Sequence, residues 1–322
     1  QPSIHTTNDV VRLGIIPLTA STCSSYAELI NKGVAVIPKR MITHNWSNLF
    51  RDLVAGIVAH SLGEHTFHFI ADLLSEEAGV KAVETMLEVQ GSLSETYWIG
   101  AFAVNQHLGI CGANPRGDVD PVTMVQHPVC TCKQKKFFNE TPPLNLNGQS
   151  INCEMNKFDD MMAWLAASNP SFAQVVCVDA SFQLFHRAWC VAEIAEAHRR
   201  GMEQSLNICN REVLIREQHA LKALQVEKMK ASRPEDVDEI LAKIPDIKAF
   251  NETLQELIFN EKFGLLSAWK KVDALQEMEE LSHMLKWVRL SETVEDCKVV
   301  WKRWPTLNSL NHQVTRSTLD SD

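Results

Sequence analysis

Apolar residues in this chain fall into short continuous runs that alternate with segments of helical spacing. The continuous runs occupy residues 33–46, 97–106 and 172–182, and a further run, SLNICN, follows Met202. Such runs are typical of strands that are buried on both faces. The intervening segments repeat their apolar residues every three or four positions, as helices with one buried face do; they occupy residues 47–65, 69–89, 154–168 and 187–202. The alternation predicts an α/β fold in which a parallel sheet carries helices on both faces.

From about Arg211 the pattern changes, because helical spacing continues to about residue 305 with no strand signal. The sequence therefore predicts an all-helical C-terminal part. An insertion at about 107–153 interrupts the α/β pattern and is too long for an ordinary connection. The predicted organisation is an N-terminal leader (1–32), an α/β domain (33–210), a helical region (211–305) and a polar tail (306–322).

Composition narrows the classes of function. A chain of 322 residues with 45% hydrophobic content can bury a full core, and it has no apolar run long enough to span a membrane. The net charge of -9, with basic residues interleaved among acids, argues against a nucleic-acid partner. Nine cysteines in a long chain do not resemble a disulfide framework, which predicts a cytoplasmic or other intracellular reducing compartment. The sequence begins at Gln1 and not at Met, so an upstream segment that targets the protein to an organelle is not excluded.

Cysteine and histidine residues gather in the insertion. Four soft ligands in a polar loop without a core are what a structural zinc ion would explain, since a tetrahedral site can order such a segment. The preferred ligand set is His107, Cys111, Cys130 and Cys132. His127 or Cys153 could replace one member of that set. The alternative is a group of free thiols, with His107 capping the end of a strand.

The segment 187–202 raises a question about one carboxylate. Spacing puts Trp189 and Glu193 on one face near the start of a helix, four residues apart. A separate stripe is predicted to be buried, and it comprises Val191, Ile194, Ala195 and His198. Since the helix follows a parallel strand, its first turns lie where open α/β sheets bind ligands. The simpler alternative is a solvated Glu193 beside a surface ion pair of Glu196 and Arg200.

Three motifs together resemble the TIR-type domains. WCVAE (189–193) is similar to their W-x-x-x-E, and MITHNW (41–46) resembles their first strand and the polar loop after it. YWIGAFAVNQH (97–107) resembles the W-I-D-x-x-C-I-N-Q segment of the related fungal heterokaryon-incompatibility domains and of TIR-like domains in protist proteins. The resemblance covers about 33–210 and implies a TIR-like, flavodoxin-like sheet. The C-terminal helices resemble uncharacterised families of algal or dinoflagellate type.

The resemblance also implies a reaction. In catalytic TIR domains the glutamate serves cleavage of the nicotinamide–ribose bond of NAD, where a carboxylate can stabilise an oxocarbenium-like centre. By this likeness Glu193 is the catalytic carboxylate and NAD is the substrate, in a signalling context. The loop residues His44, Asn45 and Trp46, together with Trp189, are the implied ligand-binding residues.

The sequence also departs from the TIR pattern. Gly100 stands where the related motif has an acid, and the insertion replaces a short loop that borders the pocket in TIR domains. Many TIR-like domains are adaptors, so the alternative function is a non-catalytic scaffold subunit that binds protein partners or self-associates. A third alternative, a cysteine hydrolase that uses Cys190, conflicts with the position of that residue in mid-helix.

Overall fold

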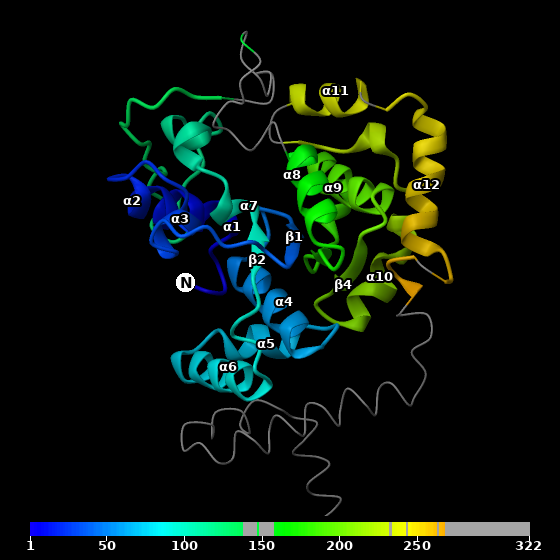
Figure 1. Ribbon diagram of the computed structural model, residues 1–322, viewed down its shortest axis with the longest axis horizontal. Helices are drawn as coiled ribbons and strands as arrows, with labels where there is room; N and C mark the ends of the chain where they lie inside the picture. The colour runs from blue at the N-terminus through cyan, green and yellow to red at the C-terminus, as the bar shows by residue number, and fades with distance from the viewer. Residues whose placement is uncertain (138–146, 148–157, 232–233, 243, 263, 268–322) are drawn as a thin grey trace, which may run out of the picture.

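A four-stranded parallel sheet lies at the centre of the molecule (Figure 1). The computed structural model describes residues 1–137, 147, 158–231, 234–242, 244–262 and 264–267. The strands are β1 (Arg40–His44), β2 (Tyr97–Ile99), β3 (Ala173–Cys177) and β4 (Glu203–Asn207). Their order is β2-β1-β3-β4, which is the order of flavodoxin-like sheets. The predicted α/β class and the parallel sheet are confirmed.

Helices cover both faces of the sheet, as the sequence predicts. One face packs on α4 (Phe50–Leu62), which α5 (His68–Leu73) and α6 (Glu77–Gln90) extend. The other packs on α8 (Phe158–Ser168) and α9 (Ala188–Arg199), with the 3-10 turn η4 (Gln183–His186) before α9. Alternation along β1 separates the two layers, since Ile42 lies in the cluster with α4 and Met41 in the cluster with α8.

The segment predicted as one helix over 69–89 is two helices, α5 and α6. The chain turns at Leu74–Glu76, and Gly79 then lies directly against the end of α5. A Cβ at Gly79 would be 2.0 Å from the carbonyl oxygen of Leu73, so a side chain cannot be accommodated there. Helical spacing continues through the turn, which is why the pattern predicted a single helix.

The predicted strand over 97–106 is correct only as far as Ile99. Strand β2 pairs with β1 over three residues, Tyr97 to Ile99. The chain then forms α7 (Gly100–Ala103) and the 3-10 turns η2 (Gln106–Leu108) and η3 (Ile110–Gly112). Ala101 is fully buried in this helical turn, so burial continues after the strand pairing has ended. The apolar pattern alone therefore does not predict where this short edge strand ends.

The N-terminal leader is helical and contributes to the core. It forms α1 (Thr7–Val10), the π-helical turn η1 (Val11–Ile15), α2 (Ile16–Thr19) and α3 (Tyr26–Ile30). Val11, Ile15 and Ile16 are buried with residues of β1 and α4. In Figure 1 these helices lie on the other side of β1 and β2 from α8 and α9.

The described C-terminal part is helical and packs on α9. It contains α10 (Arg211–Lys222), the 3-10 turn η5 (Val226–Lys228), α11 (Pro234–Ala242) and α12 (Ile247–Phe259). The rest of the predicted helical region and the polar tail lie in 268–322, outside the described residues. Of the helices that the structure describes, none combines the length and the apolar character needed to cross a bilayer.

Candidate metal centre and the Glu193 carboxylate

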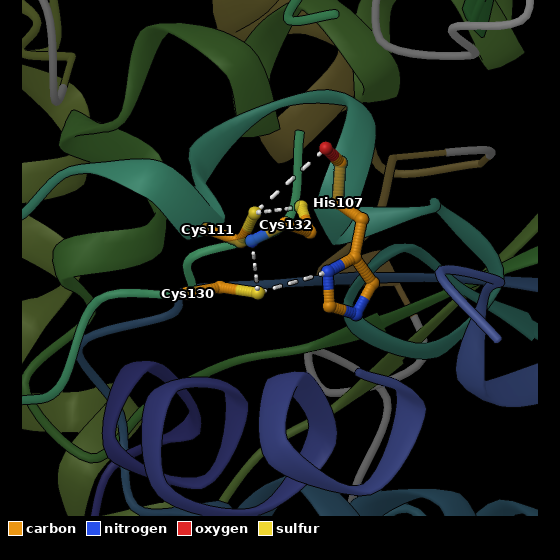
Figure 2. A group of neighbouring side chains, drawn as sticks. All are labelled: His107, Cys111, Cys130 and Cys132. Carbon is orange, nitrogen blue, oxygen red and sulfur yellow. Dashed lines mark hydrogen bonds between the residues drawn. The ribbon is translucent and has the colours of Figure 1, made fainter. Parts of the chain in front are cut away.

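The insertion brings the four preferred metal ligands together (Figure 2). Each offers one ligand atom, and these atoms all lie within 4.8 Å of one another. His107 and Cys111 are buried and come from η2 and η3, directly after the strand β2 and helix α7. Cys130 and Cys132 are half-buried and come from the returning segment of the insertion. This cluster could hold a metal ion.

Two of the distances within the cluster match the edges of a tetrahedral site. The sulfur atoms of Cys111 and Cys132 are 3.6 Å apart, and Cys130 Sγ is 3.6 Å from His107 Nδ1. Bonds of about 2.1–2.3 Å at tetrahedral angles put neighbouring ligand atoms about 3.5–3.8 Å apart. A disulfide requires sulfur atoms only about 2 Å apart, so the thiols have the spacing of co-ligands and not of a covalent pair.

Thr19 orients the imidazole of His107 for this task. The Thr19 hydroxyl donates to the carbonyl oxygen of Ile15 at 2.7 Å, so its oxygen is left to accept from His107 Nε2 at 2.9 Å. The ring proton is therefore on Nε2, and the lone pair of Nδ1 is directed at the sulfur atoms. Metal-binding histidines commonly have their second nitrogen fixed by such a partner.

Lys136 supplies a positive charge beside the sulfur atoms. Its ammonium donates to the carbonyl oxygen of His107 at 2.6 Å and to the sulfur atoms of Cys111 at 3.0 Å and Cys132 at 3.4 Å. Burial raises the pKa of Cys111 to about 11, although Lys136 opposes the rise. Burial also favours the neutral form of Cys132, but the Gln134 N–H and hydrogen bonds within the cluster outweigh it and lower the pKa to about 6. A divalent ion held by three thiolates would leave one surplus negative charge, which the Lys136 ammonium beside two of the sulfur atoms would balance.

Of the two substitute ligands, His127 does not enter the cluster. His127 is buried elsewhere, with Nε2 3.2 Å from a carboxylate oxygen of Asp9. Cys153 lies outside the described residues. The preferred ligand set therefore stands without substitution among the residues that are described.

Glu193 reaches the sheet from the second turn of α9. Its Oε2 accepts a hydrogen bond from the hydroxyl of Thr43 on β1 at 2.6 Å, and the side chain is half-buried. Burial raises the pKa of Glu193 to about 7, and the hydrogen bond from Thr43 opposes the rise. Within the described residues no basic side chain forms an ion pair with Glu193. The predicted surface pair of Glu196 and Arg200 is present on the same helix.

The predicted buried stripe of α9 is only partly correct. Val191 and Ile194 are buried, whereas Ala195 and His198 are half-exposed at the side of the helix. Cys190 is buried too, and its Sγ donates to the carbonyl oxygen of His44 at 3.5 Å. Burial raises the pKa of Cys190 well above its ordinary value, which disfavours the thiolate that a nucleophilic cysteine requires.

Two of the predicted ligand-binding residues, His44 and Trp46, lie on the sheet layer opposite Glu193. His44 follows Thr43 in the strand and so points to the opposite face, where burial lowers its pKa to about 4. Asn45 is buried, and its side-chain oxygen accepts from the backbone N–H of Ser47. Trp46 packs on the cluster shared by α4 and the N-terminal helices.

Trp189 is directed at the C-terminal helices. Its indole N–H donates to Asp236 of α11 at 2.9 Å, and its ring packs on the cluster that α9 shares with α10–α12. Spacing along the helix correctly puts it one turn before Glu193. It could not indicate that α11 supplies the hydrogen-bond partner.

Sequence reasoning missed three side chains that complete these sites. Thr19, Lys136 and Thr43 each contact a predicted residue from a distant part of the chain. Lys136 belongs to the basic cluster KQKK beside Cys132, and that proximity was the available signal. Thr19 and Thr43 carry no local signal, because only the fold brings them to His107 and Glu193.

Comparison with known proteins identifies no relative of this chain. The chain matches no known family model, no curated protein and no solved structure. The likeness to TIR-type domains therefore stays a prediction from the sequence motifs.

Proposed function

We propose that His107, Cys111, Cys130 and Cys132 bind one structural zinc ion. The support is the tetrahedral spacing of the ligand atoms, with His107 fixed by Thr19 and the surplus charge balanced by Lys136. Zinc suits a Cys3His set because it has no geometric preference of its own and takes sulfur and nitrogen ligands equally well. Four protein ligands leave no open position, so the ion is structural and does not activate water.

Metal analysis of the purified chain tests this proposal. One zinc per chain is expected, and Cys130→Ser should lower both the zinc content and the thermal unfolding midpoint. Cys209→Ser is the matched control, because Cys209 is also half-buried but lies outside the cluster. A chain without zinc, or equal loss in both variants, would contradict the proposal.

We further propose that the chain binds NAD at the carboxyl edge of the sheet and cleaves its nicotinamide–ribose bond with Glu193. The observation that supports this is the position of Glu193 beside the carboxyl end of β1, where strand order reverses between β1 and β3. Open α/β sheets bind ligands at this switch point. The TIR resemblance supplies the substrate and the role of the carboxylate.

The environment of Glu193 suits a substrate that gains positive charge. Because burial disfavours the ionised carboxylate, a cation placed beside it recovers much of the lost stabilisation. Cleavage of NAD by water gives nicotinamide, ADP-ribose and a proton. Positive charge moves from the nicotinamide ring to the ribose as the C–N bond breaks, and it leaves as the proton when water adds to the ribose. A carboxylate next to the ribose would stabilise that charge more in the transition state than in the ground state.

Nicotinamide release from NAD tests this function directly. Glu193→Gln should abolish it, while Glu196→Gln should not, because Glu196 lies on the same helix but is paired with Arg199 and Arg200. Activity that persists in Glu193→Gln would refute the assignment of Glu193. No release by the native chain would refute the function.

A non-catalytic scaffold is the second candidate, and the exposed apolar side chains of the insertion favour it. Between residues 119 and 129 these are Val119, Val122, Met124, Val125 and Val129. Contiguous exposed apolar residues commonly mark protein contacts. Sedimentation of the native chain and of Val125→Asp tests it, because self-association through this surface should be lost in the variant. A chain that is monomeric at all concentrations would contradict self-association.

A further inference from the structure

Three polar side chains lie on the sheet face that α9 covers. Thr43 on β1 and Gln174 on β3 are completely buried there, and Gln204 on β4 is half-buried. Strands covered on both faces are normally apolar at such positions, and the neighbours Met41, Val176 and Leu206 are. Polar groups in this layer must be hydrogen-bonded to be tolerated.

These side chains form one continuous hydrogen-bonded chain across three strands. Gln204 Nε2 donates to Gln174 Oε1 at 2.7 Å, and Gln174 Nε2 donates to Thr43 Oγ1 at 2.8 Å. The Thr43 hydroxyl then donates to Glu193 Oε2 at 2.6 Å. The chain thus begins on β4 and ends at the carboxylate.

The direction of donation is fixed by the backbone of α9. Gln204 Nε2 also donates to the carbonyl oxygen of Ile194 at 3.0 Å, and a carbonyl oxygen can only accept. The amide nitrogen of Gln204 must therefore face both Ile194 and Gln174, which sets the orientation of the Gln174 amide in turn. Since Thr43 accepts from Gln174, its own proton is committed to Glu193.

We propose that Thr43, Gln174 and Gln204 are positioning residues that keep Oε2 of Glu193 as a hydrogen-bond acceptor and direct Oε1 toward the ligand. A donor from the protein favours the carboxylate over the protonated acid. The chain therefore opposes the effect of burial and preserves the form that NAD cleavage requires. The role of Oε1 toward a ligand rests on the proposed function, whereas the hydrogen bond from the Thr43 hydroxyl to Oε2 does not depend on it.

Titration of Glu193 by NMR of isotope-labelled glutamate carboxyl carbons tests the fixed donor without any substrate. The signal absent from Glu193→Gln identifies the residue. Thr43→Val removes only the hydroxyl and should raise the midpoint by about 1 pH unit, since it deletes a hydrogen bond to a charged group. Thr43→Ser should restore the native midpoint.

Gln174→Leu and Gln204→Leu test whether the two amides act on Glu193 through Thr43. Without either amide, the Thr43 hydroxyl is free to turn away from Glu193, so the titration midpoint of Glu193 should rise in both variants. Ser205→Ala is the matched control, because the Ser205 side chain faces the other layer and its hydroxyl contacts the backbone carbonyl of Gln174 at 3.5 Å, not the side-chain amide. Equal midpoints in the native chain, Thr43→Val and Gln174→Leu would overturn the proposal.

Kinetics of nicotinamide release separate this proposal from the proposed function. If NAD is the substrate, Thr43→Val should lower kcat about tenfold with little change in KM, and the acidic limb of the pH profile should move to higher pH. Absence of cleavage by the native protein would refute the NAD function. The shifts in the Glu193 titration midpoint would then decide the positioning role by themselves.

Discussion

Replacing Glu193 with glutamine should remove a specific pH dependence of stability. Glu193 has a pKa of about 7 in the folded chain, against an ordinary value of 4.5 in the unfolded chain, because burial disfavours its charge. Between these pH values the folded state binds the proton more tightly. The free energy of unfolding therefore has the full contribution of Glu193 below pH 4.5 and loses it as the pH rises through about 7.

The size of the effect follows from the two pKa values. A difference of about 2.5 pH units at about 1.4 kcal/mol each gives an upper limit of about 3.5 kcal/mol. Partial exposure of the side chain reduces this to about 2 kcal/mol. Urea unfolding of the native chain and of Glu193→Gln between about pH 5 and about pH 8 measures it as the change in their difference.

Glu196→Gln provides a control with the opposite sign. Burial opposes ionisation of Glu196, but Arg199 and Arg200 outweigh it and lower its pKa, so its contribution is present at neutral pH and is lost on acidification. That loss begins only below the ordinary value of 4.5, so the difference between Glu196→Gln and the native chain should stay constant from about pH 5 to about pH 8. A constant difference between Glu193→Gln and the native chain across this range would refute the inferred pKa and the buried setting of the carboxylate.

Three further outcomes follow from the structure. Thr19→Val should weaken zinc binding about 10-fold to 100-fold in chelator competition, because it frees His107 to change orientation, and Thr19→Ser should restore binding. Gly79→Ala should destabilise the fold by about 2 kcal/mol in urea unfolding because its Cβ meets the Leu73 carbonyl, whereas Gly14→Ala, which meets nothing within 4 Å, should be neutral or stabilising. Removal of zinc with a chelator should lower the thermal unfolding midpoint and leave the Glu193 titration midpoint unchanged.

Strand positions were predictable in part, because burial on both faces produces an apolar signal that does not depend on partners. The run 172–182 contains β3, which pairs in register with β1. The run 33–46 was predicted as a strand that starts too early, because β1 begins only at Arg40 and the apolar side chains of Val34, Val36 and Ile37 before it are exposed. The end of β2 was not predictable, because Ala101 stays buried after pairing with β1 has stopped. The role of the leader was missed for a related reason, since the burial of Val11 depends on a sheet that follows it in the chain.

The candidate sites were predictable to different extents. Cysteine and histidine are rare enough that their clustering within one insertion indicated the ligand set, and η2 and η3 bring two of them together locally. The partners of those ligands are common residues from distant segments. Thr43 is 150 positions from Glu193, and Thr19 is 88 positions from His107. A polar Gln174 inside the run FAQVVCV was the one visible sign of the chain beneath α9.

The metal centre and Glu193 belong to opposite layers of the sheet. Cys111, Cys130 and Cys132 pack with the N-terminal helices and α4, on the face that Ile42 and Val175 share. Glu193 meets Thr43 on the face that α9 covers. A zinc ion bound at the first position would stabilise the layer that packs on β1 opposite α9, and it would lie outside the hydrogen-bonded chain that ends at the carboxylate. Loss of the ion should therefore lower the stability of the fold without changing the hydrogen bond from Thr43 to Glu193, so unfolding and titration serve as independent readouts.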